Sequence, residues 1–207
     1  YYRNLHSTAA LEGIGVKVIN CLNTGVFAGN KLFTHMLLKK HGVPTPDATV
    51  AFSKDAALQA LDTQGYPRVI KPTVGSWGRL ISKLNDRDAA EGIIESRENM
   101  YPIYQVHYLE EFVKRPPRDI IVAAIYRSSK HWKTNMALGG TAEPCKVTQE
   151  MEEMCIKAKH AIEGDIVGVD LMESDEKGLV VHEVNNTTEY KNTVRVCEVD
   201  IPSLMLD

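Results

Sequence analysis

The chain has 207 residues, 43% hydrophobic and 25% charged, which is typical of a globular protein and excludes the disordered and fibrous classes. Its 24 Lys and Arg against 27 Asp and Glu give a net charge of −3, so the whole chain has no overall attraction for nucleic acid or anionic membranes. No apolar run approaches the roughly 20 residues of a membrane-spanning helix, and the four cysteines and seven histidines lack the spacings of disulfide frameworks or zinc sites, so we expect a cytoplasmic protein.

The first half of the chain carries clear helix and strand signals. Asn30 and Ser53 are typical N-cap residues, and Gly42 and Gly65 are typical stops for the helices that follow them. Short apolar runs bounded by proline or glycine indicate strands. The expected elements are helices over 30–42, 53–65 and 88–97 and strands over 49–52, 67–72 and 105–113.

The second half contains more apolar strands. We expect one over 121–126, because this run is too apolar to leave one face in water. Apolar residues at helical spacing follow Thr148 and predict a helix of about four turns. Two further strands, over 166–171 and 179–184, are expected to form a hairpin around the polar turn 173–178. Helices and antiparallel strands without regular βαβ alternation predict an α+β architecture.

A lysine at the end of a buried strand, followed by a glycine-containing loop, is the first candidate site. Lys71 precedes a loop whose residues can reach phosphate oxygens through backbone N–H groups or positive charge. The order of residues is neither that of a P-loop nor GxGxxG, and an ordinary turn explains such a loop more often than a binding site does. The loop residues are Gly75, Ser76, Trp77, Gly78 and Arg79.

The hairpin over 166–184 carries the second candidate site. Glu183 and Asn185 point to one face of their strand because side chains alternate, and Asp170 meets them from the partner strand. Three hard oxygen donors suit Mg²⁺, which keeps water and nucleotide phosphates as its other ligands. Polar positions on an exposed hairpin are the alternative, but the valine-rich neighbours leave little of this hairpin for water.

A basic stretch from residue 114 to 133 is the third candidate. Its basic residues outnumber Asp119, the single acid, to give a local charge of +5 against −3 overall. It favours phosphate or an acidic partner protein, although a solvated charged face is the usual explanation for such runs. Tyr126 and Trp132 admit RNA binding, but no RNA-recognition or helix-turn-helix pattern supports it. The basic residues are Lys114, Arg115, Arg118, Arg127, Lys130 and Lys133.

Taken in chain order, the Lys71 loop, the basic stretch and the carboxylate hairpin resemble the corresponding segments of the ATP-grasp ligases, and within that family the RimK-like branch. The resemblance covers nearly the whole chain, and GSWGRL at 75–80 together with HWKTN at 131–135 is far more specific than a lone glycine motif. Within the branch the pattern looks like that of the LysX family, which attaches 2-aminoadipate to the carrier protein LysW in lysine biosynthesis, with the glutamate-using ArgX family next. Other segments that carry the likeness are 71–72, 109–113, 118–120, 123–128, Ala137, 139–140 and 183–185.

The resemblance implies an ATP-grasp fold of two α+β lobes with ATP between them. It implies that residues 1–25 are the remnant of an N-terminal α/β domain that is largely absent from this chain. Residues 26–113 would form the first part, with the small lobe and the flexible loop, and residues 114–207 the C-terminal lobe with the metal site.

The resemblance also implies a role for each matching residue. Lys31 and Lys71 would contact the ATP phosphates, and the loop from Gly75 to Arg79 would close over them. Asp119 would hold the ribose, and Asp170, Glu183 and Asn185 would bind Mg²⁺. The adenine would lie on the backbone of Glu110, Glu111, Phe112 and Val113, the catalytic groups would be Arg79, Arg127 and Asn135, and the amino-acid substrate would contact Asn192 and Thr193.

The implied reaction is phosphorylation of a carboxylate to an acyl phosphate, followed by attack of an amine to give an amide, ADP and phosphate. The implied partners are a small acidic LysW-like carrier and 2-aminoadipate, with no nucleic acid and no membrane, and the expected assembly is a homo-oligomer, a dimer or tetramer. Thr193 leaves room that a phenylalanine of the glutamate enzymes would fill, which favours the longer substrate. A glutamate–LysW ligase, another RimK-like glutamate ligase and a non-catalytic nucleotide-binding module remain the alternatives.

The sequence departs from the family pattern in three further places. Ile120 runs directly into Ile121 where family members have another arginine and a strand, so we expect a missing strand and a missing phosphate-binding arginine. Asn30 stands where an aspartate is usual, which leaves Lys31 in place. Glu198 stands where a glycine is common, and the sequence offers no reason for it.

Overall fold

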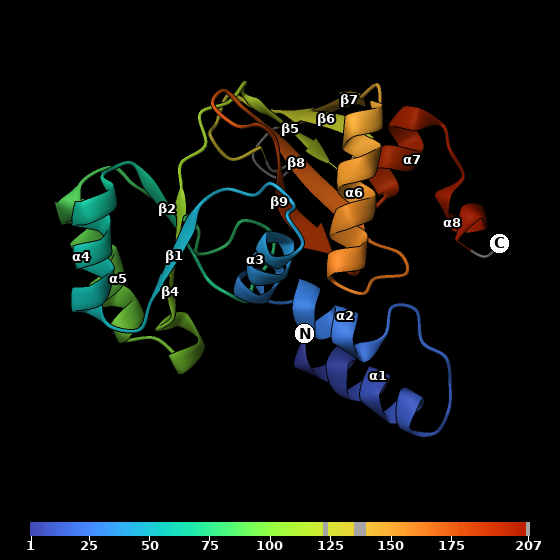
Figure 1. The fold of residues 1–207 in the computed structure, drawn as a ribbon, viewed down its shortest axis with the longest axis horizontal. Coiled ribbons are helices and arrows are strands. Elements are labelled where there is room, and N and C mark those ends of the chain that lie inside the picture. The colour runs from blue at the N-terminus through green and yellow to red at the C-terminus, as the bar shows by residue number, and fades with distance from the viewer. Residues whose placement is uncertain (122–123, 135–139, 206–207) are drawn as a thin grey trace. The chain divides into compact units, whose positions relative to one another are not determined.

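The computed structural model describes residues 1–121, 124–134 and 140–205 (Figure 1). Its contacts divide the chain into two compact units: unit 1, Tyr1–Thr45 with Lys114–Asp207, and unit 2, Pro46–Val113. Residues 26–45 therefore group with the C-terminal part of the chain, a division that differs from the three segments expected from the sequence. Over the described residues, no helix combines the length and apolar character needed to cross a membrane.

Unit 2 is a four-stranded antiparallel sheet with two helices on one face. The sheet has the order β1-β4-β2-β3, and α4 and α5 pack against each other and against its strands. Ile70 and Leu109 are fully buried beneath these helices, so the alternate residues of the same strands lie on the opposite face. The elements are β1 Ala48–Ala51, α4 Lys54–Gln64, β2 Arg68–Lys71, β3 Ser82–Leu84, α5 Arg87–Glu98, the 3₁₀ helix η1 Pro102–Tyr104 and β4 His107–Glu111.

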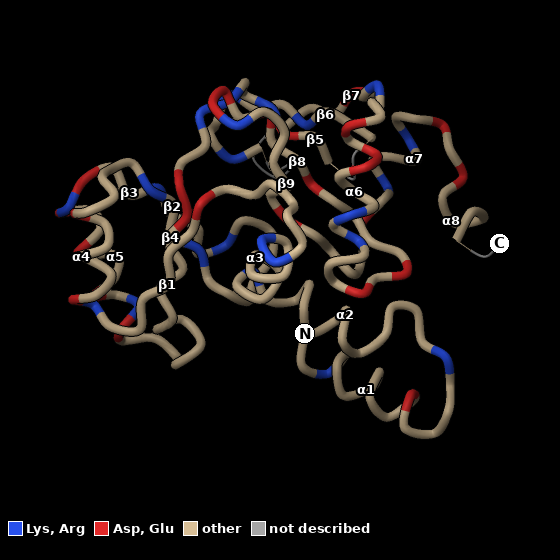
Figure 2. The backbone as a smooth tube through the Cα atoms, viewed as in Figure 1, with Lys and Arg blue, Asp and Glu red and all other residues tan. Residues whose placement is uncertain are grey.

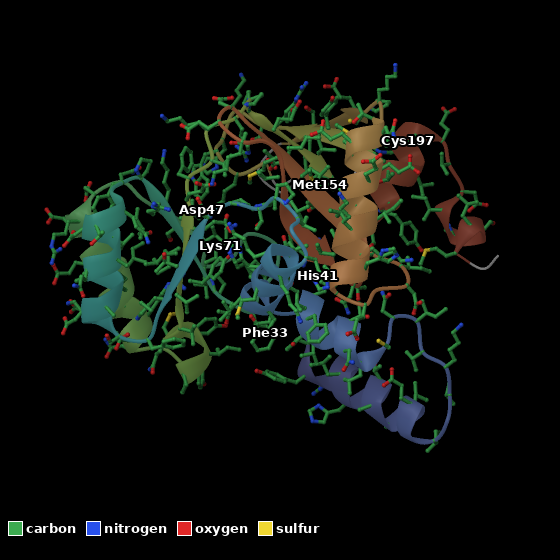
Figure 3. All side chains as sticks on the ribbon, viewed as in Figure 1. Phe33, His41, Asp47, Lys71, Met154 and Cys197 are labelled. Carbon is green, nitrogen blue, oxygen red and sulfur yellow. The ribbon has the colours of Figure 1, made fainter. Side chains whose placement is uncertain are left out.

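Unit 1 is a five-stranded antiparallel sheet of order β7-β6-β5-β8-β9, packed against α3 and α6 (Figure 1). Ile120, Leu171 and Val184 of the sheet form one core with Met154 of α6, which is labelled in Figure 3. The strands are β5 Arg118–Ile121, β6 Ile125–Ser128, β7 Thr141–Pro144, β8 Gly168–Ser174 and β9 Gly178–Asn185. The helices are α1 Tyr2–Gly13, α2 Leu22–Ala28, α3 Lys31–Lys40, α6 Gln149–Ala161, α7 Lys191–Cys197 and α8 Ile201–Leu204.

The strand expected over 121–126 was wrong. The chain turns within that run: β5 ends at Ile121, β6 begins at Ile125, and the N–H of Ala124 donates to the carbonyl of Ile121 at 3.1 Å. Ile121 and Ile125 lie opposite each other across the hairpin, so apolar residues flank the turn on both sides and hide it in the sequence. Val122 and Ala123 lie outside the described residues.

Short elements were also missed. The sequence interpretation contained no β7, α2, α7 or α8, each of which is seven residues or fewer and carries little periodicity. The hairpin β8–β9 is longer than expected, because the polar residues of the presumed turn continue the ladder as far as Ser174 and Gly178.

Candidate active site

The carboxylate pair of the candidate metal site lies across β8 and β9 in unit 1. Asp170 and Glu183 are direct register partners, and Asn185 is opposite Gly168 two residues further along. On β8, ordinary alternation puts Val169 and Leu171 in the core and Asp170 on the opposite face. On β9, the register shift allows both Val184 and Val181 to enter the core, while Glu183 stays opposite Asp170. The structure therefore brings the three predicted oxygen donors to one face of the sheet.

Lys31 is the cation beside this pair. It is the first residue of α3, where the Asn30 side chain caps the helix by accepting from the N–H of Leu32 at 3.0 Å. Its Nζ lies 3.0 Å from Oε1 of Glu183. Asparagine thus performs the capping that an aspartate would perform, which explains why the departure at this position leaves the lysine in place.

The donor set fits Mg²⁺ on chemical grounds. Two carboxylates directly opposite each other across a ladder repel, and a divalent cation with hard-oxygen preference relieves that repulsion. Asp170 is buried. Burial of the nearby Cys155 thiol, with a smaller contribution from the Asp170 charge, raises the pKa of that thiol to about 11. No group of three or more His, Cys, Asp and Glu side chains that could hold a metal ion occurs among the described residues, and the third member of the predicted set is the amide of Asn185.

A second polar network lies on β5 and β6. Asp119 and Arg127 are register partners, and both contact the buried hydroxyl of Thr134, which donates to Oδ2 of Asp119 and accepts from Nε of Arg127 at 3.2 Å. Arg115 Nε donates to the other carboxylate oxygen at 2.7 Å. Both oxygens of Asp119 thus have partners within the protein, and its predicted contact with ribose stays a prediction. Sequence reasoning missed Thr134, whose role depends on a contact fifteen residues away.

The candidate site residues of unit 2 begin with Lys71. It lies on the sheet face opposite α4 and α5, is labelled in Figure 3, and forms a buried ion pair with Glu110. The hydroxyl of Tyr108 donates to the other oxygen of Glu110 at 3.3 Å, and burial followed by the Glu110 charge raises the pKa of Tyr108 far above its ordinary value. Glu110 therefore has a side-chain role that the sequence did not indicate.

The rest of the predicted adenine strand is partly engaged within unit 2. The N–H of Glu111 donates to the carbonyl of Asp47 at 2.8 Å. The ring of Phe112 lies 3.8 Å from Nζ of Lys83, a cation–π contact. Val113 is buried at the end of this unit. The binding of adenine to this strand stays a prediction.

The loop after Lys71 is exposed and strained. Trp77 is 69% exposed and has a φ of 64°, in the region that favours glycine, and Gly78 follows at 67°. The N–H of Arg79 donates to the carbonyl of Ser76 at 3.3 Å, which closes a turn. At the end of the loop the buried Arg97 of α5 donates to the carbonyl of Leu80, an anchor that sequence reasoning missed.

The predicted substrate residues lie in α7. Thr193 is 3% exposed, and within the described residues its hydroxyl has no hydrogen-bond partner. Asn192 Oδ1 accepts from Arg195 at 3.4 Å. Glu198 ends the helix with a φ of 54°, which gives the physical reason why glycine is common at this position in the family. Asn135, the remaining predicted catalytic residue, lies outside the described residues.

The basic stretch is less exposed than its composition indicates. Arg118 forms a bidentate pair with Glu173 at 2.6 and 2.9 Å, and Arg115 pairs with the buried Asp119. The acidic turn between β8 and β9 lies beside this stretch (Figure 2), and the N–H of Asp175 donates to the carbonyl of Lys114 at 2.9 Å. The local +5 already includes Asp119, so of these contacts the Glu173 pair is the one that neutralises a further charge.

Comparison with known proteins agrees with the geometry. Residues 28–207 match the RimK-like ATP-grasp domain. Alpha-aminoadipate–LysW ligase LysX of Sulfurisphaera tokodaii is 39% identical over 99% of this chain and 75% of its own length. Glutamate–LysW ligase ArgX of Sulfolobus acidocaldarius is 36% identical over 97% of this chain and 75% of its own length.

A solved structure supports the fold. The RimK domain ATP-grasp protein of Sphaerobacter thermophilus aligns with a TM-score of 0.74 at 20% identity, over 93% of this chain and 72% of that one. The LysX alignment runs over 216 positions against 207 residues here, so this relative has residues without a counterpart in this chain. The resemblance and the α+β fold class predicted from the sequence are confirmed: the chain belongs to the RimK-like ATP-grasp family.

Proposed function

We propose that this chain is an ATP-dependent ligase that joins the amino group of 2-aminoadipate to the side-chain carboxylate of the C-terminal glutamate of a LysW-type carrier protein. The observation that carries the proposal is the arrangement of Asp170, Glu183 and Lys31. Two opposed carboxylates with a lysine 3.0 Å from one of them are suited to a magnesium–polyphosphate ligand, in a chain whose relatives are amino-acid ligases.

The chemistry proceeds by two transfers. The carrier carboxylate attacks the γ-phosphorus of ATP, which gives an acyl phosphate and ADP, and the amine then attacks the acyl carbon and expels phosphate. A bound Mg²⁺ supplies neutralisation of the phosphate charge. Asp170, Glu183 and Asn185 would hold that ion, and Lys31 would move from Glu183 to a phosphate oxygen. Arg127, held by Thr134, would stabilise the charge that develops on the transferred group.

The residues of unit 2 would bind the remainder of the nucleotide. Lys71 would offer its ammonium to the phosphates, and the exposed loop from Gly75 to Arg79 would cover them. The backbone of the strand over 110–113 would contact the adenine. Because Glu110 and Tyr108 fix the Lys71 ammonium before any ligand arrives, little ordering entropy would be lost on binding.

The choice of 2-aminoadipate is proposed from the 39% identity with LysX, and Thr193 is proposed to contact the substrate. Its buried hydroxyl has no partner among the described residues, and a buried unpaired hydroxyl costs free energy that a polar substrate group would recover. Glutamate is the second candidate, since the chain is also 36% identical to an ArgX enzyme. The two substrates differ by one methylene, which is worth about 1–3 kcal/mol of discrimination.

The experiment is a coupled assay of ADP release with four additions: ATP and Mg²⁺ alone, then with 2-aminoadipate, with a carrier ending in glutamate, and with both. We expect release that depends jointly on the amino acid and the carrier, and a kcat/KM for 2-aminoadipate about tenfold or more above that for glutamate. The reverse preference would assign the glutamate–LysW activity. Nucleotide binding without release under any addition would assign a non-catalytic module.

The carrier's approach is proposed from charge. An acidic carrier would meet the exposed lysines of the basic stretch, Lys114 and Lys130, because the arginines there are paired within the protein. Exposed charges act mainly on association rate and are screened beyond about 8 Å at physiological salt.

The chain would act in the cytoplasm as a homo-oligomer, a dimer or tetramer. Sedimentation of the purified protein tests the oligomeric state directly.

A further inference from the structure

The side chain of Asn20 connects both ends of the hairpin that carries the carboxylates. Its Nδ2 donates to the carbonyls of Ile166 at 2.6 Å and Asn186 at 2.9 Å. Its Oδ1 accepts from the N–H groups of Asp165 at 2.8 Å and Ile166 at 2.9 Å. These four bonds are the full hydrogen-bonding capacity of a carboxamide. If the Asn20 amide were rotated by 180°, its NH₂ group would face the two N–H groups and its oxygen would face the two carbonyls.

The location of these bonds matters more than their number. The ladder of β8 and β9 ends at the pair Gly168 and Asn185, and the loops beyond this pair have no strand partners to hold them. Asn186 directly follows Asn185, and Ile166 lies two residues before Gly168. One side chain therefore ties together the two backbone segments that would otherwise separate where the strands end.

Close packing around the same point supports a fixed geometry. A Cβ on Gly168 would lie 2.8 Å from Cγ2 of Thr188, so the loop after β9 folds back tightly over the start of β8. The fully buried Thr24 donates to the carbonyl of Glu163 at 2.6 Å, which attaches the segment after Asn20 to the same loop. Asn20 thus acts within a set of contacts between residues 20–24 and the base of the hairpin.

We propose that Asn20 is a positioning residue for the metal site: by holding the open end of β8–β9, it sets the distance between Asn185 and the carboxylates of Asp170 and Glu183. Asn20 lies before residues 28–207, which match the family domain, so the site depends on a residue outside that domain. The inference rests on the proposed function, because it assumes that these three side chains bind Mg²⁺.

The test compares Asn20→Ala with Asn23→Ala. Asn23 is the matched control, since it lies three residues away and its Nδ2 donates to the exposed side chain of Glu163 at 3.2 Å. Mn²⁺ replaces Mg²⁺ as a spectroscopic probe, and its affinity is measured by electron paramagnetic resonance with a non-hydrolysable ATP analogue. Circular dichroism and melting temperature are recorded for each protein.

We expect Asn20→Ala to weaken Mn²⁺ binding about tenfold or more, the size seen when residues that orient metal ligands are removed, while metal-free analogue binding changes less than twofold. Asn23→Ala should change neither. Mn²⁺ affinity within twofold of the unaltered protein in a folded Asn20→Ala overturns the inference.

Asn20→Asp guards against misfolding, since it keeps both accepting bonds and loses the two donating ones. If Asn20→Ala unfolds, Asn20→Asp should still fold and bind Mn²⁺ more weakly; loss of fold in both variants would make Asn20 a general stability residue and overturn the inference. Absence of Mn²⁺ binding in the unaltered protein would instead contradict the proposed function.

Discussion

Each unit contains a lysine–carboxylate pair among the predicted site residues or in contact with them, and the two pairs differ in burial. In unit 2 the side chains of Lys71 and Glu110 are 5% and 6% exposed. In unit 1 those of Lys31 and Glu183 are 16% and 30% exposed. A buried pair cannot separate without leaving a charge in a poorly solvated place, whereas a partly exposed pair can exchange partners with water.

This difference indicates two distinct tasks for the two lysines. Lys71 is held by Glu110, which Tyr108 also contacts, so its ammonium has one position before and after ligand binding. Lys31 lies at the start of a helix and retains contact with water, so it can leave Glu183 for an incoming phosphate at low cost. The comparison therefore predicts that the free energy of unfolding depends mainly on the Lys71–Glu110 pair, whereas the Lys31–Glu183 pair rearranges when ligand binds.

Lys71→Met should have the largest effect on stability. It removes the ammonium that forms the buried ion pair with Glu110, which costs about 3–5 kcal/mol of unfolding free energy. Urea unfolding followed by circular dichroism measures this loss. The double variant Lys71→Met with Glu110→Leu should recover most of the stability without recovering ATP binding; failure of the second change to restore stability would show that the pair is not the source of the loss.

Thr134→Val should have the next largest effect. It removes the hydroxyl that joins Asp119 to Arg127 and leaves a buried carboxylate oxygen without that donor, at a cost of about 1–3 kcal/mol. Because Arg127 loses its positioning contact, kcat should fall more than the KM for ATP rises. Thr134→Ser retains the hydroxyl and is the control, so equal loss in both variants would contradict this explanation.

Lys31→Met should change stability by less than about 1 kcal/mol, because its ion pair is partly exposed. Its effect on ADP release should nevertheless be large, since a phosphate contact is lost. Measuring unfolding and turnover in the same preparation separates the two lysines: a stability loss as large as that of Lys71→Met would remove the contrast between the pairs.

The smallest expected effect is the pH dependence of stability due to the Cys155 thiol, whose reactivity also reports the charge of Asp170. Burial, with a contribution from Asp170, raises the pKa of this thiol to about 11, so alkylation by iodoacetamide should be slow at pH 8 and accelerate toward pH 11. In the unfolded chain the Cys155 thiol has a pKa of about 8.5. Between about pH 8.5 and pH 11 the folded chain therefore keeps a proton that the unfolded chain has lost, so the free energy of unfolding should fall as the pH rises through this range.

The Asp170→Asn variant completes this test. Removing the charge should lower the pKa of Cys155, so that alkylation accelerates at a lower pH than in the unaltered protein. Cys155→Ser provides the background from the other three cysteines, all of which are free thiols in the structure. An unchanged pH profile would show that Asp170 is not charged or does not act on this thiol.

Much of the fold could be predicted from short stretches of sequence, because helix capping and strand alternation depend on residues only a few positions apart. Asn30 and Ser53 were expected as N-caps, and each accepts from a backbone N–H two or three residues ahead. The strand expected over 121–126 failed for the converse reason, since which apolar residues face each other across a turn is not visible in a short window.

The candidate site divides in the same way. Alternation along a hairpin was enough to place Asp170, Glu183 and Asn185 on one face, and the structure has them in that arrangement. The contacts of Lys71 with Glu110, of Asp119 with Thr134, and of Asn20 with the base of the hairpin join residues 15 to 166 positions apart. No local pattern specifies such pairs.

The sequence by itself determined the family, the approximate boundaries of α3, α4 and α5, and the face on which the oxygen donors lie, because capping, alternation and motif spacing act over a few residues. Only the tertiary structure decided which charges neutralise each other: Glu110 for Lys71, Glu183 for Lys31, and Glu173 for Arg118. Charge pairing depends on distance and burial in space, and the folded chain sets both.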